Sequence, residues 1–184
     1  DRDFLAARGF GRDGHMHLIP GSGVDLSAFP VTPEPPAPPV RAVLVGRLLK
    51  TKGVDDFAQA ARILKARGRD IRMVLVGAPD PGNPTTVTQD QIDAWVRDGL
   101  IDWDGERDVP GCRALVRDGD NGLLVPPRDP AALADAIDRL AADGALRRAF
   151  GAAARADVEA RLSQERIADA MQALYRRLTN GTGA

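Results

Sequence analysis

Three cationic side chains occupy one short turn early in the chain, where they could hold an anion. Arg47, Lys50 and Lys52 follow the apolar run Val43–Val45 and Gly46. An arginine offers phosphate a forked pair of donors, and a lysine offers a point charge. Cations just beyond the carboxyl end of a parallel strand, facing the start of a helix, hold anions in doubly wound sheets. The turn therefore predicts a phosphate-bearing small ligand, and a nucleotide in particular.

The glycines around this turn do not form either of the common backbone phosphate loops. A Walker loop needs a second glycine at a fixed spacing from Gly46, and the Lys50-Thr51 pair lacks it. A dinucleotide fingerprint needs glycines at the second and fifth places after Gly46, and neither is there. A Rossmann-type oxidoreductase is therefore disfavoured. Recognition of a diphosphate by side chains is the remaining interpretation.

Other chemically capable residues carry weaker patterns. His15 and His17 lack a third ligand nearby in the sequence, so no metal site is predicted. Cys112 stands beside Arg113 without a histidine close in sequence, which favours a packed thiol over a nucleophile. Trp103 ends a short apolar segment on the side expected for the ligand, so stacking on a base is an alternative to core packing. No catalytic residue is identified.

Composition excludes several classes of protein. The 25 basic and 26 acidic residues nearly balance, and the net charge of -1 makes nucleic acid an unlikely partner. The single cysteine excludes an internal disulfide framework and fits a reducing compartment, so a cytoplasmic location is expected. No apolar run reaches the roughly 20 residues that would cross a bilayer.

The elements that must position the cationic turn alternate between apolar runs and amphipathic segments. A strand, a helix and a second strand in this order form a parallel pair joined by a crossover. The expected strands are 42–45, 73–76, 100–103 and 123–125, and the expected helices are 55–67, 88–98, 130–142, 146–162 and 163–178. The pattern predicts an α/β, Rossmann-like three-layer parallel sheet with helices on both faces and additional helices at the carboxyl end.

Prolines mark a boundary before this pattern begins. Six prolines crowd residues 30–39, which is typical of an extended connector. We therefore expect a boundary between residues 1–39, which contain a linker, and a domain over residues 40–184. The last helix carries one clean apolar face, which favours core packing, although part of it could face another domain.

Several short motifs together resemble the carboxyl-terminal domain of a retaining glycosyltransferase of family 4, also called glycosyl transferases group 1, with the two-domain GT-B architecture. The motifs run in family order over nearly the whole chain, and each is modest alone. They are Gly21-Ser22-Gly23-Val24-Asp25, Val45-Gly46-Arg47-Leu48 with Lys52-Gly53, Leu75-Val76-Gly77, Trp103-Asp104-Gly105, Pro110-Gly111-Cys112-Arg113 and 118–130. The loop 78–84 further resembles bacterial members that build lipid-linked glycans and surface polysaccharides.

The resemblance implies a hexosyltransferase-type enzyme that uses a nucleotide-diphosphate sugar as donor. Residues 1–39 would be a linker and remnant of the interdomain region, and residues 40–184 would be an incomplete nucleotide-sugar-binding domain. Arg47 and Lys52, with Gly46, would hold the diphosphate, and Gly77 and Trp103 would lie near the nucleotide. No metal or other cofactor would be required. The acceptor, a glycan or a lipid-linked glycan, would sit on an amino-terminal domain that this chain does not contain. Peripheral association of the full-length protein with the inner face of the cytoplasmic membrane is a further implication.

The chain departs from the family pattern at one important segment. The family normally has two strands and a pair of glutamates with seven residues between them in the segment from Trp103 to Pro110, whereas Glu106 here runs almost directly into Pro110. Ala114 also replaces a common glutamate. We therefore expect a sheet of only three or four strands, with 123–125 moved beside 43–45 and an exposed edge or cleft. If the chain is the complete product, we expect weak or absent transferase activity. A non-catalytic nucleotide-sugar binding or interaction module is the alternative.

Overall fold

The computed structural model describes residues 2–10, 17, 19, 21–36, 38–106 and 116–180. The chain divides into two compact units. One unit comprises Glu34–Ala153, and the other combines Asp1–Pro33 with Ala154–Ala184. The predicted site residues all belong to the first of these units.

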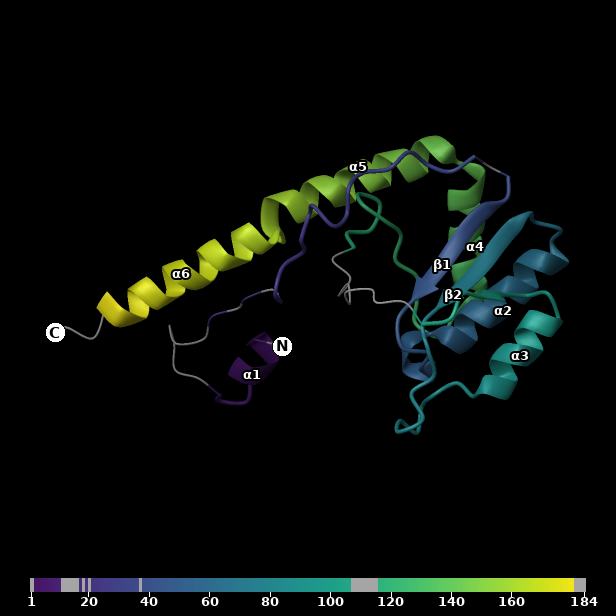
Figure 1. The fold of residues 1–184 in the computed structure, drawn as a ribbon, viewed down its shortest axis with the longest axis horizontal. Helices are drawn as coiled ribbons and strands as arrows, with labels where there is room; N and C mark the ends of the chain where they lie inside the picture. The colour runs from purple at the N-terminus through teal and green to yellow at the C-terminus, as the bar shows by residue number, and fades with distance from the viewer. Residues whose placement is uncertain are drawn as a thin grey trace. The chain divides into compact units, whose positions relative to one another are not determined.

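A three-stranded parallel sheet forms the centre of the Glu34–Ala153 unit (Figure 1). Its strands are β1 (Val40–Val45), β2 (Ile71–Val76) and β3 (Asp102–Trp103), in the order β1-β2-β3. All six residues of β1 pair with the six of β2, so the two strands end level with each other. The sheet confirms the predicted Rossmann-like α/β class with a reduced number of strands.

Helices cover one face of this sheet. They are α2 (Val54–Ala66), α3 (Gln89–Arg97) and α4 (Pro130–Ala142). In Figure 1, α4 passes behind β1, and α3 lies to the lower right of the strands. Apolar residues recur on the inner face of α2 at helical spacing and pack on the sheet. The buried core contains Leu48, Val54, Phe57, Ala58, Ala60, Ala61, Leu64, Met73, Leu75, Val87, Ile92, Trp95, Ile101 and Ala134.

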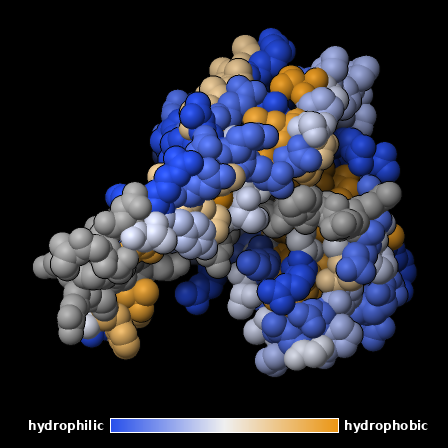
Figure 2. Space-filling view, turned by 60° about the vertical axis from the view of Figure 1, so that its left-hand side comes forward, coloured by the Kyte–Doolittle hydropathy of each residue, from blue (hydrophilic) through white to orange (hydrophobic). Residues whose placement is uncertain are grey.

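The opposite face of β1 is open among the described residues. Val43 and Val45 are 48% and 47% exposed, and the strand alternates between half-buried and exposed positions. The prediction of helices on both faces is therefore not met there. Apart from such apolar residues, the visible exterior is mostly hydrophilic (Figure 2).

Helix ends in this unit are fixed by side chains. Thr88 and Gln91 form a reciprocal capping box at the start of α3. Asp129 accepts a hydrogen bond from the amide of Ala132, and Pro130 occupies the first turn of α4, as the sequence predicted. These caps satisfy amides that a helix cannot satisfy internally.

The expected fourth strand at Leu123–Val125 is absent. These residues have no strand pairing, and no strand among the described residues pairs with the outer edge of β1. Pro126 and Pro127 follow at once and cannot donate backbone hydrogen bonds to a sheet. The prediction of an exposed edge is confirmed for the described part of the chain, whereas the relocated strand is wrong.

The second unit is organised around α6 (Gln164–Asn180) and the preceding Ser163. Val24 pairs with Ser163, and Gly23 lies so close that a Cβ there would be 2.6 Å from the Cα of Gln164. On the apolar face of α6, Ile167 is buried, whereas Met171, Tyr175 and Leu178 are exposed. Core packing therefore accounts for only the start of that face.

Two further helices complete the described secondary structure. A short helix, α1 (Arg2–Ala6), was not predicted, and α5 (Gly144–Arg161) spans the boundary between the units. In the described part of the chain, no helix has the length and apolar character needed to cross a membrane.

Candidate functional site

Two glycines bring the carboxyl ends of β1 and β2 together. Gly46 and Gly77 follow the strands directly, with φ values of 142° and 141° that other residues rarely adopt. The amide of Gly46 donates to the carbonyl of Val76 at 2.9 Å. A Cβ on Gly77 would lie 1.9 Å from the Gly46 carbonyl oxygen. The loops after the two strands therefore leave the sheet in direct contact.

The loop after β1 leads straight into α2. A single 3-10 turn (Lys50–Lys52) ends at Gly53, whose φ of 76° is left-handed. Gly53 is also the N-cap of α2, and no side chain caps this helix start. Backbone amides that point out of a helix start favour negative charge. Asp55 and Asp56 in the first turn already supply some of that charge.

The loop after β2, residues 78–87, is bonded to the loop after β1. The amide of Leu48 donates to the carbonyl of Ala78 at 3.0 Å, and the amide of Lys50 donates to the carbonyl of Thr85 at 2.8 Å. The amide of Val87 returns to the carbonyl of Leu48 at 2.8 Å. Leu48 and Val87 are fully buried, so these bonds are anchored in the core. The two loops form one platform, residues 46–50 with 78–87.

Arg47 lies on this platform with most of its side chain in solvent. It is 65% exposed, and its Nη1 lies 3.2 Å from Oδ2 of Asp80, which is 33% exposed. Lys50 and Lys52 are exposed and make no ion pair with another described residue. The site therefore has one cation with a local counter-ion and two that are open to a ligand or to water.

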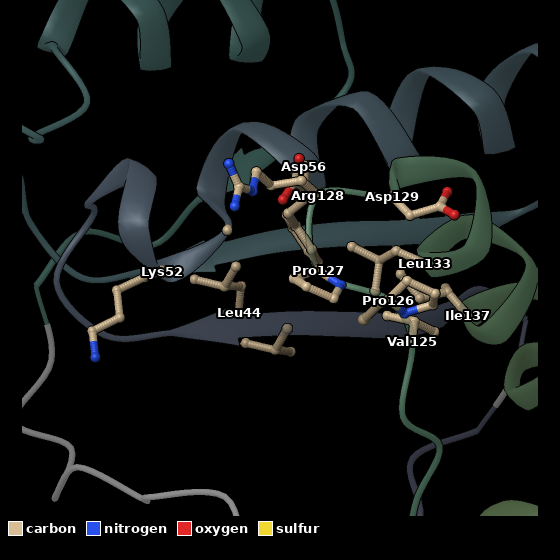
Figure 3. Close-up of a pocket in the computed structure, with 14 residues that line it drawn as sticks. Leu44, Lys52, Asp56, Val125, Pro126, Pro127, Arg128, Asp129, Leu133 and Ile137 are labelled. Carbon is tan, nitrogen blue, oxygen red and sulfur yellow. The ribbon is translucent and has the colours of Figure 1, made fainter. Parts of the chain in front are cut away.

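A pocket of about 400 Å³ lies beside β1 (Figure 3). Its apolar walls come from β1, α2, α4 and residues 125–127, and its charged lining residues are Lys52, Asp56, Arg128 and Asp129. The Lys52 side chain extends away from Arg128 and Asp56 in Figure 3. Arg128 has a left-handed φ of 60°, which is uncommon outside glycine. The pocket lies beside β1, where the sequence predicted an exposed edge or a cleft.

Trp103 is tied to the same edge of the sheet. Its Nε1 donates to the carbonyl of Gly77 at 2.9 Å, and its half-buried ring packs against the core. The indole N–H is therefore used to fix the strand end. Stacking of Trp103 on a base stays a prediction.

The structure thus brings three of the predicted residues into contact: Gly46, Gly77 and Trp103. Arg47 lies on the same platform, whereas Lys52 lines the neighbouring pocket. The sequence reasoning missed Asp80 and Arg128 as residues of the site.

The sequence carries a signal for Asp80 but none for Arg128. An acidic residue soon after the second strand could have suggested a partner for the cations of the first loop, since both loops start at the same edge. Nothing in the sequence indicates the left-handed backbone of Arg128. His17 is exposed, and the expectations for His15, Cys112, Arg113 and Ala114 fall outside the described residues.

Comparison with known proteins shows which class of protein this domain resembles. Residues 107–157 match the family described as Glycosyl transferases group 1. The structure resembles sucrose-phosphate synthase from Thermosynechococcus elongatus, with a TM-score of 0.75, 25% identity, and coverage of 98% of this chain and 57% of that chain. The fold and the family match confirm the resemblance to a GT-B type, group 1 glycosyltransferase domain.

Particular bacterial relatives extend this result. The chain is 27% identical over 172 residues to alpha-D-kanosaminyltransferase of Streptomyces kanamyceticus, covering 73% of this chain and 45% of the relative. It is 22% identical over 168 residues to the capsular polysaccharide biosynthesis glycosyltransferase CapM of Staphylococcus aureus, covering 71% of this chain and 44% of the relative. A local match of 43 residues, 23% of this chain and 5% of the relative, is 51% identical to an exopolysaccharide phosphotransferase of Streptomyces coelicolor. The chain spans less than half the length of these curated relatives.

Proposed function

We propose that this chain is the donor-binding part of a retaining glycosyltransferase and that it binds a nucleotide-diphosphate sugar on the platform. The observation that carries the proposal is the position of the exposed cation Arg47 immediately after the Gly46 turn at the carboxyl end of β1. In open α/β sheets, ligands bind outside the carboxyl ends of the strands. Lys52, on the same turn, is the second diphosphate contact.

These cations would act on the leaving group. When the sugar is transferred, the bond between the sugar carbon and the diphosphate oxygen breaks, and negative charge grows on the diphosphate. Arg47 and Lys52 would stabilise that charge electrostatically, which is a role that needs no proton transfer by either residue. No residue of this chain is assigned a catalytic role, and no metal is needed in the proposed reaction.

The acceptor we propose is a glycan or a lipid-linked glycan, held by an amino-terminal domain outside this sequence. The match to CapM, named for capsular polysaccharide biosynthesis, supports this class of acceptor. The cytoplasm is the compartment we propose, because the single cysteine fits a reducing medium. Because the sequence lacks the paired-glutamate segment, we propose that this chain binds the donor but turns it over weakly or not at all.

Isothermal calorimetry with uridine and guanosine diphosphate sugars tests the donor site. We expect binding by the wild type and a loss of about tenfold or more in affinity for Arg47→Ala and for Lys52→Ala, since a hydrogen bond to a charged group contributes about 1.5–3 kcal/mol. Arg62→Ala is the matched control, because it removes an exposed cation from the middle of α2. Affinities that fall equally in all three variants, or no binding by the wild type, would refute the site.

Two additional measurements test the rest of the proposal. Adding EDTA should leave the measured affinity unchanged, whereas a requirement for a divalent cation would contradict the metal-free site. Release of free nucleotide diphosphate, followed with a suitable acceptor mixture, should be undetectable or slow for this chain. Rapid turnover would contradict the proposed loss of activity, and binding without any turnover fits the non-catalytic alternative equally.

A further inference from the structure

The Arg47–Asp80 pair joins the two loops of the platform through one nitrogen of the guanidinium. Among the described residues, Asp80 is bonded to Nη1 alone, with 3.2 Å between Nη1 and Oδ2 of Asp80. A guanidinium has five N–H donors, and the fork that binds phosphate uses two of them. Asp80 therefore occupies one donor nitrogen of the guanidinium that, in the proposed function, binds the diphosphate.

Asp80 is held in place by its own loop. Its backbone amide donates to Oγ1 of Thr86 at 2.8 Å. Thr86 itself pairs with Leu49, opposite the Arg47 turn. Asn83 tightens the same loop by accepting from both the amide and the hydroxyl of Thr85, at 2.9 and 2.8 Å. The carboxylate is consequently presented to Arg47 by a framework that is bonded to the core.

The position of the charge makes Asp80 a competitor of an anionic ligand. An oxygen of a phosphate and Oδ2 of Asp80 are both acceptors for the same guanidinium, and two anions on one cation repel each other. Arg47 is the more exposed partner, so a ligand reaches it from solvent without moving the loop. The ligand must either displace Asp80 or share Arg47 with it.

We propose that Asp80 is a built-in counter-ion that competes with the donor diphosphate for Arg47 and thereby lowers the affinity of the site. The inference rests on the proposed function, because it takes Arg47 as a diphosphate contact. It adds a residue that sets how tightly the site holds its ligand. Release of the diphosphate after transfer would be helped by the return of Asp80 to Arg47.

The test measures binding of uridine diphosphate and of inorganic pyrophosphate by calorimetry. Asp80→Asn keeps the shape of the side chain and removes its charge. We expect both probes to bind about two- to fivefold more tightly, the range expected for an exposed ion pair. Asp135→Asn is the matched control, since it breaks an exposed pair with Arg67, at 2.6 Å, at the far end of α2. The control should leave both affinities unchanged.

A second background shows whether the gain passes through Arg47. In Arg47→Ala, adding Asp80→Asn should give no gain, because the cation for which Asp80 competes is gone. A gain of equal size in that background would overturn the inference, since it would show a general electrostatic effect. Unchanged or weaker binding in Asp80→Asn would also overturn it, because it would make Asp80 an orienting partner of Arg47. If neither the wild type nor Asp80→Asn binds either probe, the proposed function and this inference both fall.

Discussion

The contact between Gly77 and Gly46 leads to a sharp prediction for Gly77→Ala. A methyl group at Gly77 would lie 1.9 Å from the carbonyl oxygen of Gly46 and 2.9 Å from its carbonyl carbon. No side-chain rotation relieves this contact, because both partners are backbone atoms. The ends of β1 and β2 must therefore move apart.

The expected cost has two parts that can be separated. An alanine at φ 141° costs about 1–3 kcal/mol in backbone strain. Separation of the strand ends also breaks hydrogen bonds such as that from the Gly46 amide to the Val76 carbonyl, which contributes about 1 kcal/mol, and similar bonds follow. We expect Gly77→Ala to lose about 3–5 kcal/mol of unfolding free energy. Gly46→Ala has nearly the same φ and no atom within 4 Å of its Cβ, so it should lose only the strain.

Urea unfolding followed by tryptophan fluorescence measures both variants. The protein has two tryptophans, Trp95 and Trp103, and both pack in or against the core of the Glu34–Ala153 unit. The signal therefore reports on the unit that contains the platform. If the two alanine variants differ by less than about 0.5 kcal/mol, the close approach of the glycines does not hold the strand ends together.

The remaining predictions concern helix starts and one carboxylate. Gly23→Ala should destabilise the second unit, because its Cβ would lie 2.6 Å from the backbone at the start of α6. Gly21→Ala is the control, because its Cβ would meet nothing within 4 Å. Circular dichroism during heating should give a lower melting temperature for Gly23→Ala than for Gly21→Ala. Thr88→Ala should lower the unfolding free energy by about 1 kcal/mol in urea through loss of the α3 cap. Hydrogen bonds from the hydroxyl and amide of Ser27 hold the pKa of Asp25 below 3.8, so this turn is stabilised above that pH and loses the stabilisation as the pH falls through the lowered pKa. NMR titration of Asp25 should give a lower midpoint in the wild type than in Ser27→Ala.

Most helices and strands could be predicted from the sequence because their apolar residues repeat at the spacing of the element they form. The periodicity of α2 and the apolar runs of β1 and β2 depend only on local order along the chain. The segment 123–125 failed because an apolar triplet becomes a strand only where a partner edge accepts its backbone, and the prolines after it prevent continued pairing. Local pattern could not supply that information.

The site was predictable to the extent that residue type determines it. Arg47 and the glycines after each strand could be recognised because a parallel sheet brings the ends of neighbouring strands to one edge. The pairing of Asp80 with Arg47 and the bond from Trp103 to Gly77 depend on how two loops pack, which spacing along the chain does not encode. The bond from Trp103 to Gly77 gives the indole N–H a role in supporting the strand end, whereas stacking of the ring on a base stays a prediction.

The bonding between the loops of the platform has a consequence for the timescale of ligand recognition. Loops that close over a ligand usually open in the absence of that ligand, because their local stability is low. Here the amides of Leu48, Lys50 and Val87 bridge the two loops, and Leu48 and Val87 are buried. Their exchange with solvent deuterium should therefore require unfolding of the whole unit. The donor would then meet a surface that is already in its binding conformation, and rearrangement would be confined to exposed side chains such as Arg47.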